Sequence, residues 1–327
     1  MNESATYSEE ENKQDMDTSS DVEKNDLETI FPDLPESEDI DEIRETEELP
    51  PLIVPGVKTI LTDNNRSIEK PEAIIQVAKR CDVGARERNE DSCLIFSSES
   101  GGHFSMMPFG LYIVADGMGG HTNGHVASKI ASRMAANHIL KEIYLPLLVN
   151  DGPPQVGIRD VLVDAVQAAN TAVFQDEPEI DSGTTLTVAL LLGNRLYVAH
   201  VGDSRLYLHT PEKFEAVTND HSLVQRLQDV GQLTAEEATI YRYRNVLLRA
   251  VGQGDEVEID TYMRLLPKKG TLLLCSDGLC GFVTDDVMDN ILKLDEPLQQ
   301  KVHDLYEAAM TANSNDNVTV ILVNFAL

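Results

Sequence analysis

Short apolar runs recur along the chain from about residue 72 onward, and several of them stop at a carboxylate. Leu111–Ala115 leads into Asp116, and Thr271–Ser276 leads into Asp277, with glycine following in both cases. A short run rich in aliphatic residues and followed by glycine predicts a buried strand that ends in a loop. Such a strand holds the carboxylate at its end in a fixed position.

Two more carboxylates stand next to apolar runs. Arg195–Val201 precedes Gly202-Asp203-Ser204, and Asp316 lies just before Val318–Val323. A single Asp-Gly pair more often marks a tight turn than a binding site. Four strand ends in one sheet, however, would bring four carboxylates together. Carboxylates that cluster repel one another unless a cation neutralises them. Hard oxygen ligands suit Mg²⁺ or Mn²⁺, so the pattern predicts a divalent metal site.

Apolar periodicity predicts the remaining elements. We expect further strands at 73–78, 91–96, 184–192, 195–201, 271–276 and 318–323, and helices at 126–144, 161–174, 223–233 and 298–312. Gly193-Asn194 suits a hairpin turn, and Thr234 is placed to cap a further helical turn. Consecutive strands with separate groups of helices favour an α+β sandwich, with helices outside the sheets, over a strictly alternating layout.

The N-terminal segment differs in composition from the rest of the chain. Residues 1–50 hold 19 Asp and Glu against three Lys and Arg, about −16 of the formal net charge of −30. So acidic and apolar-poor a segment cannot bury enough surface to offset chain entropy. We therefore expect a disordered tail over 1–50, a linker over 51–71 and a catalytic domain over 72–327. The tail either recruits a basic partner, blocks the cleft in cis or only aids solubility, and its composition favours the last.

The charge and the cysteines exclude several classes of protein. A chain of net charge −30 lacks the clustered Lys and Arg that phosphate backbones require, so nucleic acid is not an expected partner. No N-terminal signal peptide and no apolar stretch near the ~18 residues of a spanning helix are evident, so no membrane is expected either. The four cysteines form no metal or disulfide spacing, which fits reduced thiols in a cytoplasmic protein.

Seven motifs carry a family resemblance. In order, they are Arg86-Glu87-Arg88-Asn89-Glu90-Asp91, Asp116-Gly117-Met118-Gly119-Gly120, Gly183-Thr184-Thr185, Val201-Gly202-Asp203-Ser204-Arg205, Asp220-His221-Ser222, Ser276-Asp277-Gly278 and Asp316-Asn317. Together they resemble the metal-dependent protein phosphatases, the type 2C serine/threonine phosphatases in their bacterial form, across residues 72–327. The resemblance implies an αββα four-layer sandwich with two central, mainly antiparallel sheets flanked by helix pairs.

The resemblance also implies an activity and a metal centre. A hydroxide bridging two Mn²⁺ or Mg²⁺ ions would hydrolyse phosphoserine and phosphothreonine in phosphoproteins that a serine/threonine kinase has modified, within reversible phosphorylation signalling. Asp116 is expected to bridge both metals, and the Gly117 carbonyl to bind one of them. Asp277 and Asp316 are expected to complete the ligands of the other. This agrees with the chemistry, because phosphate monoesters hydrolyse very slowly without catalysis and a two-metal site supplies both nucleophile and charge neutralisation.

Three residues of the first motif receive roles from the same resemblance. Glu90 and Asp91 match an acidic pair at metal-bound water and are expected in the outer shell. Arg86 matches the residue that binds the substrate phosphate, which a guanidinium does through two parallel hydrogen bonds. The alternative is a surface arginine paired with Glu90 at helical spacing.

Two departures from the family pattern affect the expected chemistry. Animal members carry a histidine as proton donor where this chain has Met118, so the donor is open: a metal-bound water, His121 or His221, although both histidines are more often structural. Asp203 matches a ligand of a third metal. Its usual carboxylate companion is replaced by Gly281, so third-metal binding should be weak or altered.

The segment 220–252 matches the family's variable flap beside the active site. Its Arg242, Arg244 and Arg249 either contact the phosphoprotein or are ordinary solvated charges.

The sequence leaves two rival functions open. One is a non-catalytic phosphoprotein-binding scaffold on the same fold, and the other is a different two-metal hydrolase such as a nuclease.

Overall fold

The computed structural model describes residues 73–327, apart from 101–106, 120–122, 151–153, 177–181, 235–236 and 239. All described residues belong to one unit, Asn65–Leu327. The tail and linker expected over 1–50 and 51–71 lie outside the described residues, as does His121. No helix among the described residues is long and apolar enough to cross a membrane.

Two antiparallel sheets form the centre of the unit. One has the order β1 (Ile74–Asp82), β11 (Val318–Ala326), β10 (Lys269–Cys275), β7 (Arg205–His209) and β8 (Phe214–Ala216). The other has the order β2 (Asp91–Ser98), β3 (Phe109–Gly119), β5 (Leu186–Leu192), β6 (Arg195–Val201) and β9 (Asp260–Leu265), while β4 (Ser182–Thr184) pairs with β3. All pairings among these strands are antiparallel. We call them the β11 sheet and the β3 sheet.

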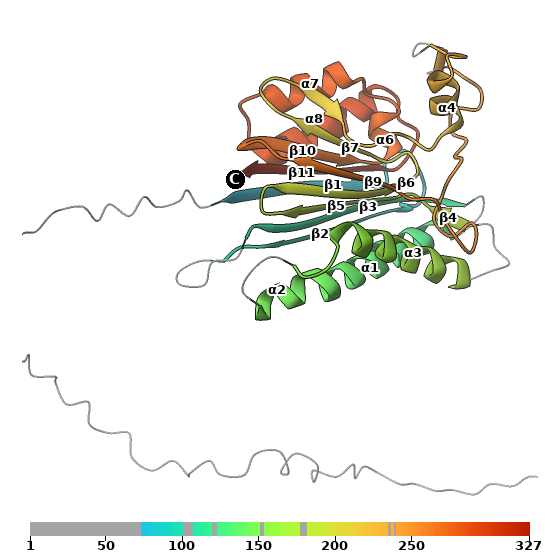
Figure 1. Ribbon diagram of the computed structural model, residues 1–327. Coiled ribbons are helices and arrows are strands. Elements are labelled where there is room, and N and C mark those ends of the chain that lie inside the picture. Colours follow the sequence, from blue (N-terminus) through green and yellow to red (C-terminus); the bar gives the residue numbers. More distant parts are fainter. Residues whose placement is uncertain are drawn as a thin grey trace, which may run out of the picture. The chain divides into compact units, whose positions relative to one another are not determined.

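Helices cover the outer face of each sheet (Figure 1). The β3 sheet carries α1 (Gly124–Ile139), which continues through a π-helical turn (Leu140–Tyr144) into α2 (Leu145–Val149), and α3 (Ile158–Asp176). The β11 sheet carries α6 (Asp277–Cys280), α7 (Asp285–Lys293) and α8 (Leu298–Thr311). The short helix α4 (Leu223–Asp229) stands out at one end of the sandwich, near the end where α6 and β4 lie (Figure 1).

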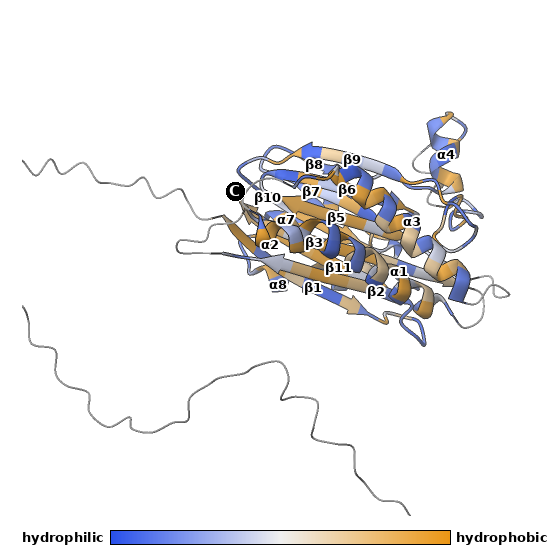
Figure 2. Ribbon diagram, turned by 60° about the horizontal axis from the view of Figure 1, so that its bottom comes forward, coloured by the Kyte–Doolittle hydropathy of each residue, from blue (hydrophilic) through white to orange (hydrophobic). Residues whose placement is uncertain are grey.

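Side-chain alternation along the strands creates three apolar layers. On β3, Leu111 and Ile113 pack toward the helices of the β3 sheet, whereas Tyr112 and Val114 face the other sheet. The third layer lies between the β11 sheet and α6–α8. Apolar residues accordingly dominate central strands such as β3 and β5 (Figure 2). The expected α+β sandwich is confirmed.

The structure corrects the predicted limits of two elements that carry carboxylates. Strand β3 does not end at Asp116 but continues to Gly119, because Gly117 pairs with Thr184 of β4. A Cβ at Gly117 would lie 2.6 Å from the Glu90 carbonyl oxygen and would also overlap the backbone of Gly124. Glycine therefore lets the strand pass directly beneath the start of α1.

Further differences are short elements that the periodicity did not predict. Asp277 lies not in a loop but at the first position of α6, and the chain also forms β7, β8, β9 and α7. Helix α4 ends at Asp229, earlier than expected. Two local predictions are confirmed: Gly193 has the positive φ of a tight hairpin turn, and Thr234 and Glu237 exchange reciprocal capping hydrogen bonds of 3.2 and 2.9 Å.

Tyr112 offers a test of the layer between the sheets. Its side chain is fully buried and its hydroxyl has no hydrogen-bond partner among the described residues. An unsatisfied buried hydroxyl is costly, so Tyr112→Phe should raise the free energy of unfolding by about 1 kcal/mol in urea denaturation. The matched control is Tyr207→Phe, whose hydroxyl accepts from Arg205 at 3.1 Å and donates to Asp285 at 3.3 Å. That variant should lose stability, and equal effects in the two variants would contradict the prediction.

Candidate functional site

Carboxylates from both sheets meet at one end of the sandwich. Asp91 of β2 and Asp116 of β3 are register partners in the β3 sheet. Asp277 follows β10, and Asp316 precedes β11, its neighbour in the β11 sheet. The Ser276 hydroxyl joins the two sheets by donating to Asp91 Oδ2 at 2.7 Å. Residues that lie far apart in the chain thus form one acidic centre.

Burial and mutual repulsion raise the pKa of these carboxyl groups. Burial raises the pKa of Asp277 to about 6, and the neighbouring charge of Asp316 adds to that shift. Burial likewise raises the pKa of Asp91 to about 7. The pKa of Asp116 lies well above its usual value, first because the group is buried and then because Asp91 and Asp277 are close. A bound cation would remove this electrostatic cost.

Asp203 belongs to the same centre. Burial and the nearby charges of Asp277 and Asp220 raise its pKa well above the usual value. Asp203, Asp277 and Asp316 all line one cavity. The structure therefore brings the expected third-metal residue next to the others, although Gly281 leaves no second carboxylate at the position after α6.

Unpartnered oxygens test whether a metal fits this centre. Asp91 Oδ1 and Asp277 Oδ1 are buried and have no hydrogen-bond partner among the described residues. Among those residues no three or more His, Cys, Asp or Glu side chains are arranged so that they could hold a metal ion. Asp316 Oδ2 accepts from Arg86 Nη2 at 2.7 Å. A donor set of a few carboxylates and carbonyls that leaves places for water suits Mg²⁺ or Mn²⁺ better than a metal that needs a closed cage.

The backbone of Asp116 is held rigidly. Its N–H donates to Thr185 Oγ1 at 2.9 Å, and its carbonyl accepts from the Thr184 hydroxyl at 2.9 Å and the Thr185 N–H at 2.8 Å. Thr185 Oγ1 also lies 2.7 Å from Ser204 Oγ, next to Asp203. The Gly183-Thr184-Thr185 motif thus fixes the position of the central carboxylate.

Arg86 reaches the centre from the connection between β1 and β2. Its Nη2 donates to Asp316 Oδ2 at 2.7 Å and its Nε to the Asn315 carbonyl at 2.9 Å. The hydrogen bond to Asp316 raises the pKa of the guanidinium. The side chain is 52% exposed, so a ligand arriving from solvent can meet it. Its connection is not helical, so the alternative of an Arg86–Glu90 pair at helical spacing is wrong.

Asn317 organises this connection, a role that the sequence did not reveal. Its Nδ2 donates to the carbonyls of Val83 and Arg88 at 2.8 and 2.9 Å, and its Oδ1 accepts from the Glu90 N–H at 2.8 Å. The Glu90 carbonyl in turn accepts from the Gly117 N–H at 3.2 Å. The Asn317 side-chain amide thus fixes the positions of Arg86 and Glu90 relative to β11. Its place directly after Asp316 in a motif was the signal that pointed to it.

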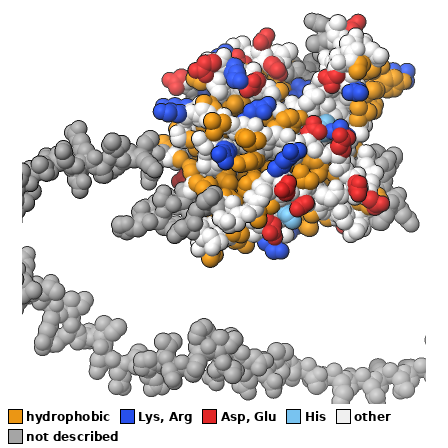
Figure 3. Space-filling view, in the orientation of Figure 1, with side chains coloured by type: hydrophobic (Ala, Val, Ile, Leu, Met, Phe, Trp, Pro, Cys, Tyr) orange, Lys and Arg blue, Asp and Glu red, His pale blue; other side chains and the backbone are white. Residues whose placement is uncertain are grey.

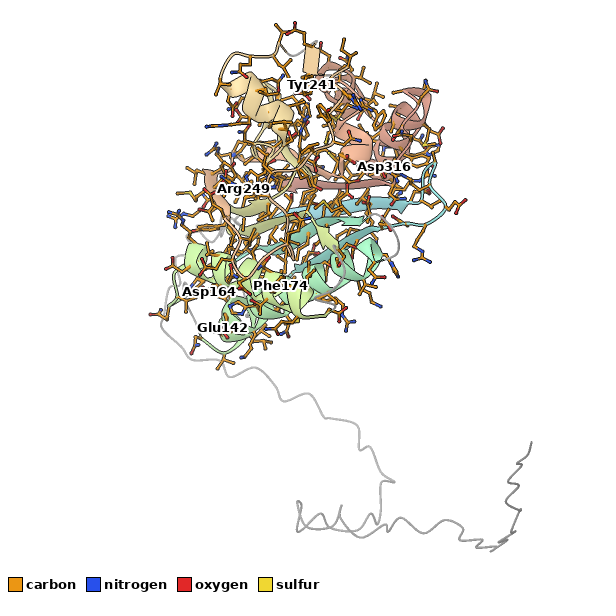
Figure 4. All side chains as sticks on the ribbon, turned by 90° about the vertical axis from the view of Figure 1, so that its right-hand side faces the viewer. Glu142, Asp164, Phe174, Tyr241, Arg249 and Asp316 are labelled. Atoms are coloured by element: carbon orange, nitrogen blue, oxygen red, sulfur yellow. The ribbon has the colours of Figure 1, made fainter. Side chains whose placement is uncertain are left out.

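A cavity of about 510 Å³ opens from the carboxylates toward the flap. Its lining includes Gln225 and Arg244 of the flap and Phe282 beyond α6. The Arg244 guanidinium lies 5.2 Å from the centre of the Phe282 ring. Figure 4 views this end of the molecule and labels Asp316 at the centre and Tyr241 in the outlying flap segment. The cavity has room for more than a phosphate group.

The flap arginines and His221 divide into different roles. Arg249 donates to Asp260 at 2.9 Å and pairs with Glu258 at 2.8 Å, so it anchors the base of the flap. Arg244 lines the cavity, and Arg242 lies 5.4 Å above the Tyr243 ring. His221 Nδ1 accepts from the Gly202 N–H at 3.2 Å, which supports the structural reading of this histidine.

Arg205 and Asp220 form an ion pair that the motifs did not predict. Arg205 binds Asp220 through paired bonds, with Nε–Oδ1 at 2.8 Å and Nη2–Oδ2 at 2.7 Å. Both residues line the cavity. This ion pair connects β7 to the start of the flap and forms one wall of the site.

The fold and this acidic cleft are those of a metal-dependent hydrolase, and comparison with known proteins defines the family. Residues 78–227 match the family model "Protein phosphatase 2C". The chain is 36% identical over 242 residues to the serine/threonine phosphatase stp of Listeria monocytogenes, covering 73% of this chain and 90% of that protein. It is 35% identical over 218 residues to the protein phosphatase PhpP of Streptococcus pneumoniae, covering 65% and 85%.

Solved structures agree. The Mycobacterium tuberculosis serine/threonine phosphatase PstP/Ppp superposes with a TM-score of 0.64 at 35% identity, covering 76% of this chain and 98% of that one. The PstP catalytic domain in complex with two manganese ions gives a TM-score of 0.64 at 34% identity, covering 78% and 100%. The chain belongs to the protein phosphatase 2C family. It is a serine/threonine phosphatase of the bacterial type, as the seven motifs predicted.

Asn317→Ala tests how the Arg86 connection is held. The substitution leaves two carbonyls and one N–H without their partner, so the free energy of unfolding should fall by about 2 kcal/mol in chemical denaturation. Asn324→Ala on β11 is the control, because Asn324 is exposed and its side-chain hydrogen bond to Thr271 is 3.5 Å long. Equal stability of the two variants would contradict the proposed anchoring.

Proposed function

We propose that Asp116, Asp277 and Asp316, with the Gly117 carbonyl, hold two Mn²⁺ or Mg²⁺ ions at which phosphoserine and phosphothreonine in proteins are hydrolysed. The observation that carries this assignment is the buried group of carboxylates with the unpartnered Asp277 Oδ1 at its centre. The ions, when bound, supply a hydroxide at neutral pH and neutralise the phosphoryl oxygens. The PstP structure with two manganese ions supports the number and kind of ion.

Each protein group has a separate task in this proposal. Asp116, fixed by Thr184 and Thr185, would hold both ions. Asp277 and Asp316 would contribute ligands from the β11 sheet. Asp91, held by the Ser276 hydroxyl, would remain outside the ligand set, where its unpartnered Oδ1 could orient water. Glu90 is assigned to the same outer shell.

Arg86 is the proposed phosphate-binding residue. It stands at the edge of the carboxylate group, half exposed, with its guanidinium on Asp316. A phosphate dianion is a stronger partner for a guanidinium than a single carboxylate oxygen, because it accepts two parallel hydrogen bonds. If Arg86 exchanged its bond to Asp316 for bonds to the substrate phosphate, the Asp316 carboxylate would be free to bind a metal ion. Substrate binding would in this way complete the set of metal ligands.

The proton for the leaving serine or threonine comes, in this proposal, from water. Met118 has no proton to give, and His221 is engaged through both ring nitrogens, since Nδ1 accepts from the Gly202 N–H at 3.2 Å and Nε2 lies 3.4 Å from Asp260 Oδ2. Asp203 remains in reach of a third ion, and without a second carboxylate at Gly281 this ion would be held weakly.

The partners and the setting of the reaction follow from the same chemistry. We infer that the substrates are phosphoproteins made by a serine/threonine kinase and that they bind in the cavity between α6 and the flap. On the face shown in Figure 3, Lys and Arg side chains are scattered among Asp and Glu, an unfavourable arrangement for binding nucleic acid. The four free cysteines suit a reducing compartment, so we place the protein in the cytoplasm.

Metal dependence tests the central assignment. With Mn²⁺ the protein should release phosphate from phosphoserine and phosphothreonine peptides, and a chelator should stop the release. Asp116→Ala and Asp277→Ala should lower kcat/KM about 1,000-fold, since several kcal/mol of charge stabilisation is lost. The control is Glu256→Ala, an exposed carboxylate. Full activity in either aspartate variant would refute the assigned centre, and Mn²⁺ binding by calorimetry without turnover would favour a phosphoprotein-binding scaffold.

Arg86 can be tested separately from the metal ions. Arg86→Ala should raise KM for a phosphothreonine peptide about 10- to 100-fold, the equivalent of a lost charge-assisted pair of hydrogen bonds, while Mn²⁺ affinity is kept. Arg86→Lys should recover little, because one ammonium cannot reproduce the two parallel bonds. Arg264→Ala is the control, since Arg264 lies exposed on the edge strand β9. An unchanged KM in Arg86→Ala would rule out phosphate binding by this residue.

A further inference from the structure

Cys81 and Cys93 meet at the root of the Arg86 connection, although no motif includes them as a pair. Cys81 is the last residue but one of β1, and Cys93 is the third residue of β2. The two strands belong to different sheets. Cys81 Sγ of β1 lies 3.9 Å from the Asp91 carbonyl oxygen of β2, and Lys79 Nζ of β1 lies 3.9 Å from Cys93 Sγ of β2, so the contacts between these two strands bring the thiols next to each other. Both side chains are only partly buried.

Strand alternation explains why the thiols face each other. On β1, Ile75 and Val77 point into the layer between the sheets, and Cys81 shares their parity. On β2, Cys93 and Ile95 point into that layer from the opposite side. The pair therefore spans the sandwich at its edge, where solvent and small oxidants have access.

The surroundings prepare Cys81 Sγ to react as a nucleophile. It accepts hydrogen bonds from Thr319 Oγ1 at 3.2 Å and Asn89 Nδ2 at 3.3 Å, which stabilise the thiolate form of the sulfur. Lys79 places its ammonium 3.9 Å from Cys93 Sγ. A thiol in an electropositive, partly exposed setting beside a second thiol has the features of a redox-sensitive site.

We propose that Cys81 and Cys93 form a reversible disulfide when the protein meets hydrogen peroxide, and that this bond weakens substrate binding by Arg86. The Cys81 sulfur attacks one peroxide oxygen, so an S–O bond forms and the O–O bond breaks, and the thiol proton leaves with the departing hydroxide as water. Cys93 then attacks the Cys81 sulfenic acid, the S–S bond forms, and a second water leaves. The two sulfurs lose two electrons in total, which reduce one peroxide to two waters. A dithiol reductant reverses the reaction by exchange.

The bond acts on the site through Asn89. In the reduced protein, Asn89 Nδ2 binds Cys81 Sγ, while Asn89 Oδ1 accepts from the Asp91 N–H at 3.1 Å. When Cys81 Sγ moves toward Cys93 to form the disulfide, it can no longer accept the hydrogen bond from Asn89 Nδ2. The connection that carries Arg86 then loses one of its anchors, although the Asn317 bonds remain. The expected consequence is a change in KM more than in metal binding.

Peptide mapping tests the disulfide without using activity. Trypsin cleaves after Arg80, Arg86, Arg88 and Lys129, so Cys81 and Cys93 fall in the separate peptides 81–86 and 89–129. After hydrogen peroxide treatment of the full chain and alkylation of free thiols, these peptides should appear as one linked species, two hydrogens lighter than their sum. Cys275 and Cys280 share the single peptide 270–293, so a bond between them would be distinguished within the same digest.

Variants and kinetics decide the outcome. Cys93→Ser should abolish the linked species, and Lys79→Gln should slow its formation a few-fold. Oxidised wild-type protein should show a KM for phosphothreonine peptide raised about fivefold, the factor that matches one net hydrogen bond, with recovery in dithiothreitol and no change in Cys93→Ser. Absence of the linked species at peroxide concentrations that oxidise either thiol would overturn the proposal, as would a linked protein with unchanged KM. The kinetic arm rests on the proposed function, whereas the mass measurement stands without it.

Discussion

Repulsion among buried carboxylates is the constraint around which this end of the molecule is built. Asp91, Asp116, Asp203 and Asp277 lose hydration and face one another's charge, which raises the pKa of each. Burying several like charges destabilises a protein core, so stability alone does not explain this cluster of carboxylates. The two sheets, held together by an apolar layer, supply the free energy that keeps the carboxylates in place. The result is a buried acidic site whose oxygen donors suit a divalent cation.

The supporting hydrogen bonds come mostly from neutral side chains. Thr184 and Thr185 hold the backbone of Asp116, Ser276 holds Asp91, and Asn317 holds the connection with Arg86. None of these groups adds charge to an already acidic centre. Hydroxyl and amide groups can therefore orient the carboxylates without weakening their attraction for metal ions. Arg86 is the exception, and its exposure at the rim matches a partner that arrives with the substrate.

The local sequence was sufficient for long elements and insufficient for short ones. The strand at 318–323 and the helix at 298–312 were placed nearly as observed, because each buries a continuous apolar face. Strands β7, β8 and β9 were missed, because β7 and β8 are only five and three residues long and β9 ends in three consecutive exposed residues. The continuation of β3 past Asp116 depends on β4, a three-residue strand that exists only through its pairing with β3. Helix α6 is a single turn, too short for any periodicity to appear.

By itself, the sequence indicated which carboxylates come together, because the apolar runs that end on Asp116, Asp277 and near Asp316 are local patterns of the chain. It also determined the family, since seven motifs in one order leave few alternatives. Only the tertiary structure decided which side chains serve these carboxylates. Asn317 holds residues of another strand's connection, and Cys81 meets Cys93 across two sheets. Such contacts depend on how the two sheets stack and on the register of their strands, and the local sequence does not specify either.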